Sequence, residues 1–153
     1  MKVGAVILIA MSLTGTSVLA NAQDQDRPDD KEAVRHIVQA YFEGHTKNDV
    51  QAENKAVHPQ ALWVFASKNN RLYISTQKQR TKTLKENARR VMRASDATLR
   101  IDSIDVTGGA ACAKIEVESQ LAVVTHYLLL LKDPGGEWKI VGGTVWPMQK
   151  EKK

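Results

Sequence analysis

The sequence predicts an α+β domain in which a curved antiparallel sheet forms a cone-shaped roll around a long N-terminal helix. As far as about residue 92, apolar residues recur mostly at the three- and four-residue spacing of helices, and from Ala97 onward they follow the two-residue period of strands. Turn signals at residues 107–109 and 133–136, with a softer break at 119–120, divide the second part into four strands. Helices followed by an antiparallel meander indicate a sheet with its helices on one side.

The first residues predict export. Lys2 precedes an apolar stretch, and Ala20 and Ala22 are the small residues that a signal peptidase requires, so residues 1–22 are expected to be a cleavable signal peptide. The apolar run is too short to cross a bilayer, and we expect no membrane span. The mature protein is then periplasmic or secreted. It has a polar flexible leader, one domain and a short charged tail, over residues 23–29, 30–148 and 149–153.

Composition limits the partners and the chemistry. Removing the signal peptide leaves 131 of the 153 residues, which suits one domain with its own core. Cys112 is the single cysteine, so no internal disulfide can form, and its Ala-rich surroundings predict a small buried residue. The net charge is +5, with much of the excess between Lys78 and Arg93. That run has no interleaved aromatic residues, so we expect a solvated helix face and no nucleic-acid partner.

The first helix is predicted to begin at Asp29, which has the spacing of a capping box with Glu32. The apolar residues that follow recur at helical spacing and are Val34, Ile37, Val38, Tyr41 and Phe42. The next position along this stripe is His45, which we expect to face the core. His36 falls on the opposite face and is expected to be solvated.

A short second helix and a hairpin are expected next. Residues 48–49 (Asn-Asp) provide an N-cap for the helix, and residues 58–59 (His-Pro) should end it. Residues 62–67 and 72–75 are β-rich runs on either side of the turn signal at residues 69–70, which predicts a hairpin.

The rest of the chain predicts a helix and a bent sheet. The third helix is expected over about residues 76–92, with a narrow apolar stripe opposite its basic face. In the strands that follow, the apolar phase changes near Ser103, which predicts a β-bulge that bends the sheet. Residues 123–131 are apolar on both faces, as in a central strand covered on both sides. The open end of the resulting cone is a natural place for a ligand.

Several motifs give the chain a resemblance to a known superfamily. They are Tyr41-Phe42-Glu43-Gly44-His45 with Asn48-Asp49, then Val57-His58-Pro59, Tyr127-Leu128-Leu129-Leu130-Leu131-Lys132 and Gly136-Glu137-Trp138-Lys139-Ile140-Val141. Their order and spacing resemble the nuclear transport factor 2-like superfamily, with its cystatin-like cone, and within it the branch named putative lumazine-binding, close to the polyketide-cyclase-like members. Gln60 departs from the acid that this family usually has after the His-Pro pair. Relatives include isomerases, cyclases, dehydratases and toxin-neutralising partners, so the resemblance implies the fold and no single function.

The candidate site residues are histidines and aromatic residues that could line the cone. His45 and His126 are the candidates for catalysis, because an imidazole can donate or accept a proton near neutral pH. The predicted ligand-binding residues are Tyr41, His45, His58, Trp63, His126, Tyr127 and Trp146. For each of them a structural role in the core, at a helix end or in a loop is the alternative. The histidines lack the spacing of a metal site and no cofactor motif is present, so we predict neither a metal nor a cofactor.

Three functions are compatible with these patterns. The first is an exported protein that binds a small, partly apolar molecule of unidentified structure, because polar and aromatic residues fall at predicted inward positions without an evident catalytic acid. The second is an isomerase, cyclase or dehydratase with His45 or His126 as the base. The third is a protein-interaction module, because the doubly apolar strand over residues 123–131 would expose a large patch. A homodimer through the sheet is expected under all three.

Overall fold

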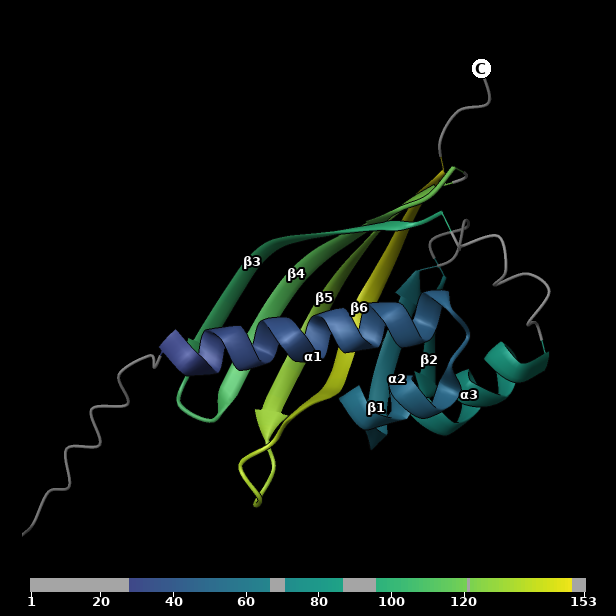
Figure 1. Ribbon diagram of the computed structural model, residues 1–153. Coiled ribbons are helices and arrows are strands. Elements are labelled where there is room, and N and C mark those ends of the chain that lie inside the picture. Colours follow the sequence, from purple (N-terminus) through teal and green to yellow (C-terminus); the bar gives the residue numbers. More distant parts are fainter. Residues whose placement is uncertain (1–27, 67–70, 87–95, 121, 150–153) are drawn as a thin grey trace, which may run out of the picture.

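The computed structural model describes residues 28–66, 71–86, 96–120 and 122–149; the predicted signal peptide lies outside this part of the chain. A long N-terminal helix packs on one face of a six-stranded sheet, which confirms the α+β class (Figure 1). The elements in chain order are α1 (Pro28–Thr46), α2 (Val50–Ala56), β1 (Val57–Ala66), β2 (Leu72–Thr76), α3 (Gln77–Glu86), β3 (Thr98–Thr107), β4 (Ala110–Glu118), β5 (Ala122–Lys132) and β6 (Trp138–Gln149).

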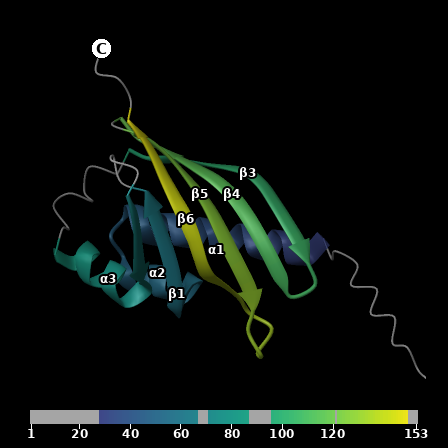
Figure 2. The ribbon, with the colours of Figure 1, turned by 180° about the vertical axis from the view of Figure 1, so that it is seen from behind.

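The strands form one sheet in the order β2-β1-β6-β5-β4-β3. The last four strands pair antiparallel in sequence order, as predicted. The sheet is nevertheless mixed, because the β1–β2 hairpin joins the meander at its last strand and β1 runs parallel to β6. In Figure 1, α1 lies across the concave side of the curved sheet. Seen from behind, β3 to β6 have no described helix over them (Figure 2).

The predicted bulge near Ser103 is present. The pairing of β3 with β4 shifts register between Ile101 and Ser103, so Asp102 is the extra residue. An inserted residue bends a strand and increases its twist, which fits the curvature of this side of the sheet. The β-bulge that the change of apolar phase predicted near Ser103 is therefore confirmed.

A second bulge, which the sequence analysis did not predict, reverses the phase of β6. The pairing with β5 passes from Gly142 directly to Ile140, so Val141 is the extra residue. Ile140 is buried in the core, and beyond the bulge Val145 packs against that core. Because one inserted residue exchanges the two faces of a strand, Trp146 lies on the outer face, where half of its surface is exposed.

Helix α1 begins at Pro28, two residues earlier than the predicted domain start, so the end of the predicted leader is helical. Proline is favoured in the first turn because its missing N–H has no helical partner there. The predicted stripe is confirmed, since Val34, Val38 and Tyr41 are buried. His36 is exposed, as expected.

Helix α1 ends in a turn that leads directly into α2. Asn48 adopts a left-handed conformation with a φ of 54°. The N–H of Asp49 donates to the carbonyl of Gly44 at 2.8 Å and that of Asn48 to the carbonyl of His45 at 3.3 Å, which is the Schellman pattern of a helix end. The Asp49 side chain caps α2, as predicted. The helix ends at Ala56, and His58 and Pro59 belong to β1 instead of forming the helix stop.

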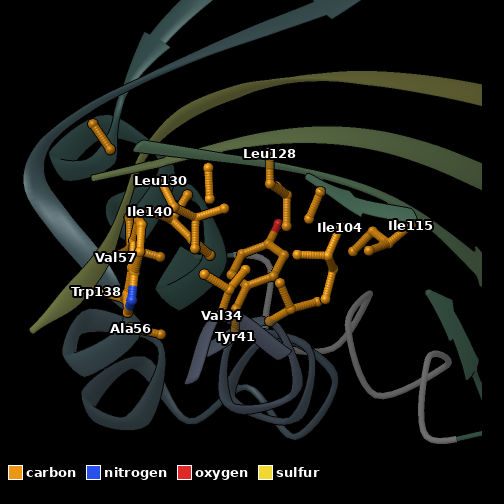
Figure 3. Close-up of a cluster of buried hydrophobic side chains, with 14 of the residues drawn as sticks. Val34, Tyr41, Ala56, Val57, Ile104, Ile115, Leu128, Leu130, Trp138 and Ile140 are labelled. Carbon is orange, nitrogen blue, oxygen red and sulfur yellow. The ribbon is translucent and has the colours of Figure 1, made fainter. Parts of the chain in front are cut away.

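The core lies between α1 and the inner face of the sheet. Figure 3 shows Val34 and Tyr41 of α1 against Ile104, Ile115 and Leu128 of the sheet. Trp63 of β1 and Trp138 of β6 complete this buried cluster. Cys112 was expected to be buried, but it lies half-buried on the outer face beside exposed Leu129.

The basic run is only partly a solvated face. Lys82 and Lys85 of α3 are exposed, but Arg80 is buried, with 8% of its surface accessible, and so is Gln77. The prediction for Arg80 was therefore wrong. Residues 87–95 of the predicted third helix lie outside the described residues. No helix of the described part is long and apolar enough to cross a membrane.

Candidate functional site

A cavity of about 410 Å³ lies between α1, α3 and the inner face of the sheet. Its polar lining residues are Tyr41, His45, Thr46, Ser75, Arg80, Thr83, Ser119 and His126. Its apolar lining residues are Phe42, Phe65, Ala97, Val117, Val124 and Val145. The cavity thus has an apolar wall and one region where ionisable side chains meet.

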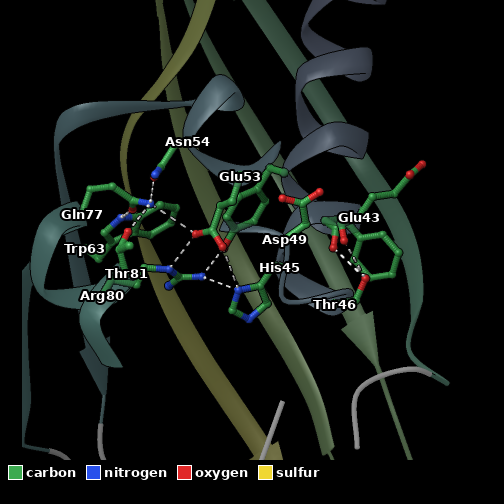
Figure 4. Close-up of polar contacts among 12 residues, drawn as sticks. Glu43, His45, Thr46, Asp49, Glu53, Asn54, Trp63, Gln77, Arg80 and Thr81 are labelled. Carbon is green, nitrogen blue, oxygen red and sulfur yellow. Dashed lines mark hydrogen bonds and ion pairs between the residues drawn. The ribbon is translucent and has the colours of Figure 1, made fainter. Parts of the chain in front are cut away.

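Those side chains belong to a hydrogen-bonded group, here called the polar cluster, which consists of Tyr41, His45, Glu53, Gln77, Arg80 and His126. Figure 4 shows four of them, His45, Glu53, Gln77 and Arg80. They come from four elements, because α1 supplies Tyr41 and His45, α2 supplies Glu53, and α3 supplies Gln77 and Arg80. His126 comes from β5. The cluster therefore forms only when the whole fold is assembled.

Glu53 is the anion at the base of the cluster. It is 1% exposed. Its carboxylate accepts from Arg80 Nε at 3.3 Å and from Gln77 Nε2 at 3.4 Å, and its Oε2 lies 3.4 Å from His45 Nδ1. Burial raises the pKa of this carboxyl, but the His45 hydrogen bond and the Arg80 charge outweigh burial and hold the pKa below its usual value. Glu53 is therefore an ionised, paired carboxylate.

Arg80 connects Glu53 to the cavity wall. Its Nη2 donates to Tyr41 Oη at 2.7 Å and lies 3.3 Å from His45 Nδ1. The guanidinium also lies over the ring of Trp63, 4.4 Å from the ring centre, where it gains cation–π attraction. Trp63 is held in turn by a 2.9 Å hydrogen bond from its Nε1 to Gln77. These contacts fix a planar cation at the polar end of the cavity.

Tyr41 and His126 are both uncharged at neutral pH. Burial raises the pKa of Tyr41 to about 12 against the opposing effect of Arg80. Burial, together with the Arg80 charge, lowers the pKa of His126 to about 3. Tyr41 Oη accepts from Arg80, so its own proton can be donated to His126 Nδ1, 3.5 Å away. In that arrangement the ring proton of His126 is on Nε2, which makes His126 a hydrogen-bond donor.

His45 has two competing partners for one nitrogen. Its Nδ1 lies near a donor, Arg80 Nη2, and an acceptor, Glu53 Oε2. A protonated Nδ1 donates to Glu53 and an unprotonated Nδ1 accepts from Arg80, so the two contacts belong to different protonation states or tautomers. The ring also lines the cavity. In either state the second nitrogen, Nε2, has no hydrogen-bond partner among the described residues.

The structure brings together four of the predicted site residues. Tyr41, His45 and His126 line the cavity. Trp63 lies behind Arg80, and its ring stacks on that of Tyr41 at 5.6 Å. These four occupy the inward positions that the sequence predicted.

The other three predicted residues lie away from the cavity. Tyr127 is exposed on the outer face, because it neighbours the inward His126 in a strand and adjacent strand residues face opposite sides. Trp146 is outward because of the Val141 bulge. His58 caps its own turn by accepting the Gln60 N–H at 3.2 Å. Tyr127 and Trp146 therefore do not line the cavity, and their predicted role in ligand binding is wrong for this cavity.

Three members of the polar cluster, Glu53, Gln77 and Arg80, were missed, and two of them had a signal in the sequence. Glu53 is one turn before the apolar residues Ala56 and Val57. Arg80 is four residues before Leu84, on the predicted apolar stripe. Within the described residues, no group of three or more His, Cys, Asp or Glu side chains could hold a metal ion.

The fold defines a class, the α+β proteins with the cone-shaped fold of nuclear transport factor 2-like proteins. The chain belongs to the family described as Putative lumazine-binding, whose model matches residues 29–144. No curated protein matches the sequence.

Solved structures are similar in fold. A nuclear transport factor 2-like protein of Methylobacillus flagellatus has a TM-score of 0.70 at 21% identity, with 82% of this chain and 97% of that chain covered. One from Shewanella baltica has a TM-score of 0.66 at 21% identity, covering 80% and 96%. A ketosteroid isomerase-like protein of Erwinia carotovora atroseptica has a TM-score of 0.66 at 10% identity, covering 81% and 100%. At these identities the likeness shows the fold alone.

Proposed function

We propose that the protein binds a small, partly apolar molecule in the cavity between α1 and the sheet. The supporting observation is the division of the cavity wall into an apolar region and one polar end at which Tyr41, His45, Arg80 and His126 meet. Small-molecule sites typically combine apolar walls with a few fixed polar groups, in volumes of about 300–1,000 Å³. The apolar wall would provide binding energy and the polar end would fix the orientation of the ligand.

A thermal-shift screen of the mature protein against a broad metabolite library tests this proposal. We expect a saturable rise in melting temperature with some members, because a ligand that binds only the folded state stabilises it. The cavity-filling variant Val124→Phe should abolish the shift. Val123→Phe is the matched control, since the preceding residue of the same strand faces outward and does not line the cavity. A library without any saturable response, or a response that survives Val124→Phe, contradicts the proposal.

Proton transfer is a second candidate function, and the contact between Glu53 and His45 favours it. When Nδ1 of His45 donates to Glu53 Oε2, the lone pair of the ring is on Nε2, as in a general base oriented by a carboxylate. His126 is the weaker candidate, because its lowered pKa and its contact with Tyr41 make it a donor. His45 would then be the base of an isomerase, cyclase or dehydratase.

Carbon-bound hydrogen exchange in deuterium oxide tests this second function on ligands found in the screen. We expect exchange with the wild type and at least about a hundredfold slower exchange in His45→Gln, the usual loss when a general base is removed. That variant should still bind the ligand, more weakly than the wild type, because the apolar wall and Arg80 are unchanged. If the wild type exchanges the ligand's hydrogen only at the uncatalysed rate, proton transfer is contradicted and binding remains the only proposed function.

A homodimer through the outer face of the sheet is part of the proposal. Half-exposed apolar side chains gather there on β5 and β6, namely Tyr127, Leu129, Leu131, Trp146 and Met148. A patch of this kind on a monomer is unfavourable in water, and a second copy of the sheet would cover it. Light scattering at micromolar concentration should give twice the monomer mass; a monomer contradicts the dimer.

Export is proposed from the sequence. If residues 1–22 are a signal peptide, the protein recovered from the exported fraction of its host should begin at Gln23. Intact-mass spectrometry of the exported fraction measures this directly. A full-length protein retained inside the cell would contradict export.

A further inference from the structure

One nitrogen of the Arg80 guanidinium has no protein partner in the described part of the chain. Arg80 donates through Nε to Glu53 and through Nη2 to Tyr41, and no partner for Nη1 exists among the described residues. Arg80 nevertheless lines the cavity. A guanidinium has five N–H groups, and those on Nη1 are not taken up by the protein, so they are suited to a ligand acceptor.

The charges around the cavity favour an anionic acceptor. No carboxylate is among its lining residues in the described part of the chain, because Glu53 lies behind Arg80 and His45. The ionisable lining groups are one guanidinium, two imidazoles and a tyrosine hydroxyl. A ligand therefore meets donors first, and Arg80 offers the planar geometry that matches a carboxylate.

We propose that the cavity selects a small amphipathic monocarboxylate, with its carboxylate on Arg80 Nη1 and His45 Nε2 and its apolar body against Phe42, Val124 and Val145. This inference rests on the proposed binding function and names the class of ligand. The volume of about 410 Å³ limits the body to a small molecule and excludes a long chain.

Binding of a carboxylate is coupled to a proton on His45. Arg80 and Glu53 cancel each other's charge, so a bound carboxylate leaves one excess negative charge unless another group becomes positive. His45 both contacts Glu53 and lines the cavity, and it is that group. Once protonated, its Nδ1 donates to Glu53 and its Nε2 donates to the ligand, which ends the competition for Nδ1. Tyr41, Arg80 and His126 are the other titratable or charged groups of the cluster around it.

Calorimetry with matched acid and amide pairs tests the proposal. The probes are straight-chain, branched and aryl monocarboxylates, each paired with its primary amide, for example octanoate with octanamide and hydrocinnamate with hydrocinnamamide. We expect the best acid to bind about tenfold or more tighter than its amide, the gain typical of charge-assisted hydrogen bonds. Titrations in PIPES and imidazole buffers, which differ in ionisation heat, should show net proton uptake with the acid and none with the amide.

Three variants distinguish specific binding of the carboxylate at Arg80 and His45 from non-specific attraction of anions to a basic protein. His45→Gln should abolish proton uptake and reduce the preference for the acid. The double variant Glu53→Gln/Arg80→Gln removes the ion pair without leaving a lone buried charge, and it should bind acid and amide equally. Lys82→Gln removes an exposed cation of the same helix and should leave the preference unchanged.

The outcomes distinguish the two proposals. Amides or other neutral molecules that bind at the cavity as tightly as acids would overturn the carboxylate inference and leave the binding function intact. An acid preference unchanged in both His45→Gln and the double variant would also overturn it. Absence of binding by every probe and every library member would overturn both.

Discussion

Gly44 and Glu53 meet backbone to backbone where α1 and α2 come together. A Cβ atom built on Gly44 would lie 2.6 Å from the backbone N and 2.9 Å from the Cα of Glu53, closer than real Cβ atoms approach. The absence of a side chain at Gly44 therefore lets α2 lie against α1. This contact places the carboxylate of Glu53 within reach of His45, the residue that follows Gly44.

Gly44→Ala should destabilise the protein and weaken ligand binding. The added methyl group must push backbone atoms of α2 away, and overpacking of this kind costs about 1–3 kcal/mol, more than alanine gains as a helix former. Urea unfolding measures the loss. Gly109→Ala is the control, because its Cβ would meet only Lys132 Cβ at an ordinary 3.8 Å. Equal stability of both variants would show that the contact between α1 and α2 has room for a methyl group.

Arg80→Gln should cost more stability than the double variant Glu53→Gln/Arg80→Gln. The single change leaves a buried carboxylate without its cation, which costs about 3–5 kcal/mol, whereas the double change removes both charges. Chemical unfolding at low temperature compares the two free energies of unfolding. Lys82→Gln should stay within about 0.5 kcal/mol of the wild type, as is usual on the surface. A double variant that is less stable than Arg80→Gln would mean that Arg80 is not the main partner of the Glu53 carboxylate.

The periodicity of helices and strands explains which site residues could be placed from the sequence. Tyr41, His45 and His126 were placed correctly because uninterrupted helical or strand periodicity sets their direction. Trp146 was placed wrongly because the Val141 bulge inserts one residue into β6, and an inserted residue exchanges the faces of every residue beyond it. The bulge near Ser103 was detectable because apolar residues stand on both sides of it, whereas Gly142 and Gly143 give no apolar phase.

Arg80 and Glu53 show a different limit of the sequence. Each is a charged residue at an apolar position of its helix, and charged residues are exposed by default. Their burial depends on a contact between α2 and α3, across 27 positions of the chain, which no local pattern records. A charged residue on the apolar stripe of one helix could have been paired with an opposite charge on the stripe of another. Opposite charges on the apolar stripes of two helices would therefore have predicted the buried contact between Glu53 and Arg80.

Acidification from pH 7.5 to pH 5 should destabilise the wild type through the buried His126. Folded His126 has a pKa of about 3, and the ordinary value is 6.5, so below pH 6.5 the unfolded chain binds a proton that the folded chain does not. Stability is therefore full above pH 6.5 and is lost as the pH falls, by about 2 kcal/mol at pH 5. Glu53 adds a loss only below its ordinary value of 4.5, because its pKa is lowered.

The variant His126→Gln isolates this contribution. Glutamine does not titrate and can still accept from Tyr41, so the stability difference between pH 7.5 and pH 5 should shrink by most of that amount. His36→Gln, at an exposed position, should retain the wild-type pH dependence within about 0.5 kcal/mol. Unfolding curves at both pH values supply the comparison. Identical pH dependence in the wild type and His126→Gln would contradict the neutral, buried state of His126.

Leu129→Lys should convert the proposed dimer to a monomer. Leu129 lies on the outer face of β5 among half-exposed apolar residues, and a lysine there would place one charge from each copy into the interface. Loss of a central interface residue costs about 2 kcal/mol or more, which raises the dissociation constant about 30-fold or more. Sedimentation over a concentration series measures the constant.

The control for this change is Gln39→Lys, which adds the same charge at an exposed position of α1, on the other side of the molecule from the outer sheet face. It should leave the dimer intact. The folded state and ligand binding should persist in Leu129→Lys, because the cavity is on the opposite face of the sheet. If Leu129→Lys remains dimeric while the wild type is a dimer, the two copies pair through another surface, and the apolar face of β5 and β6 then needs a different partner.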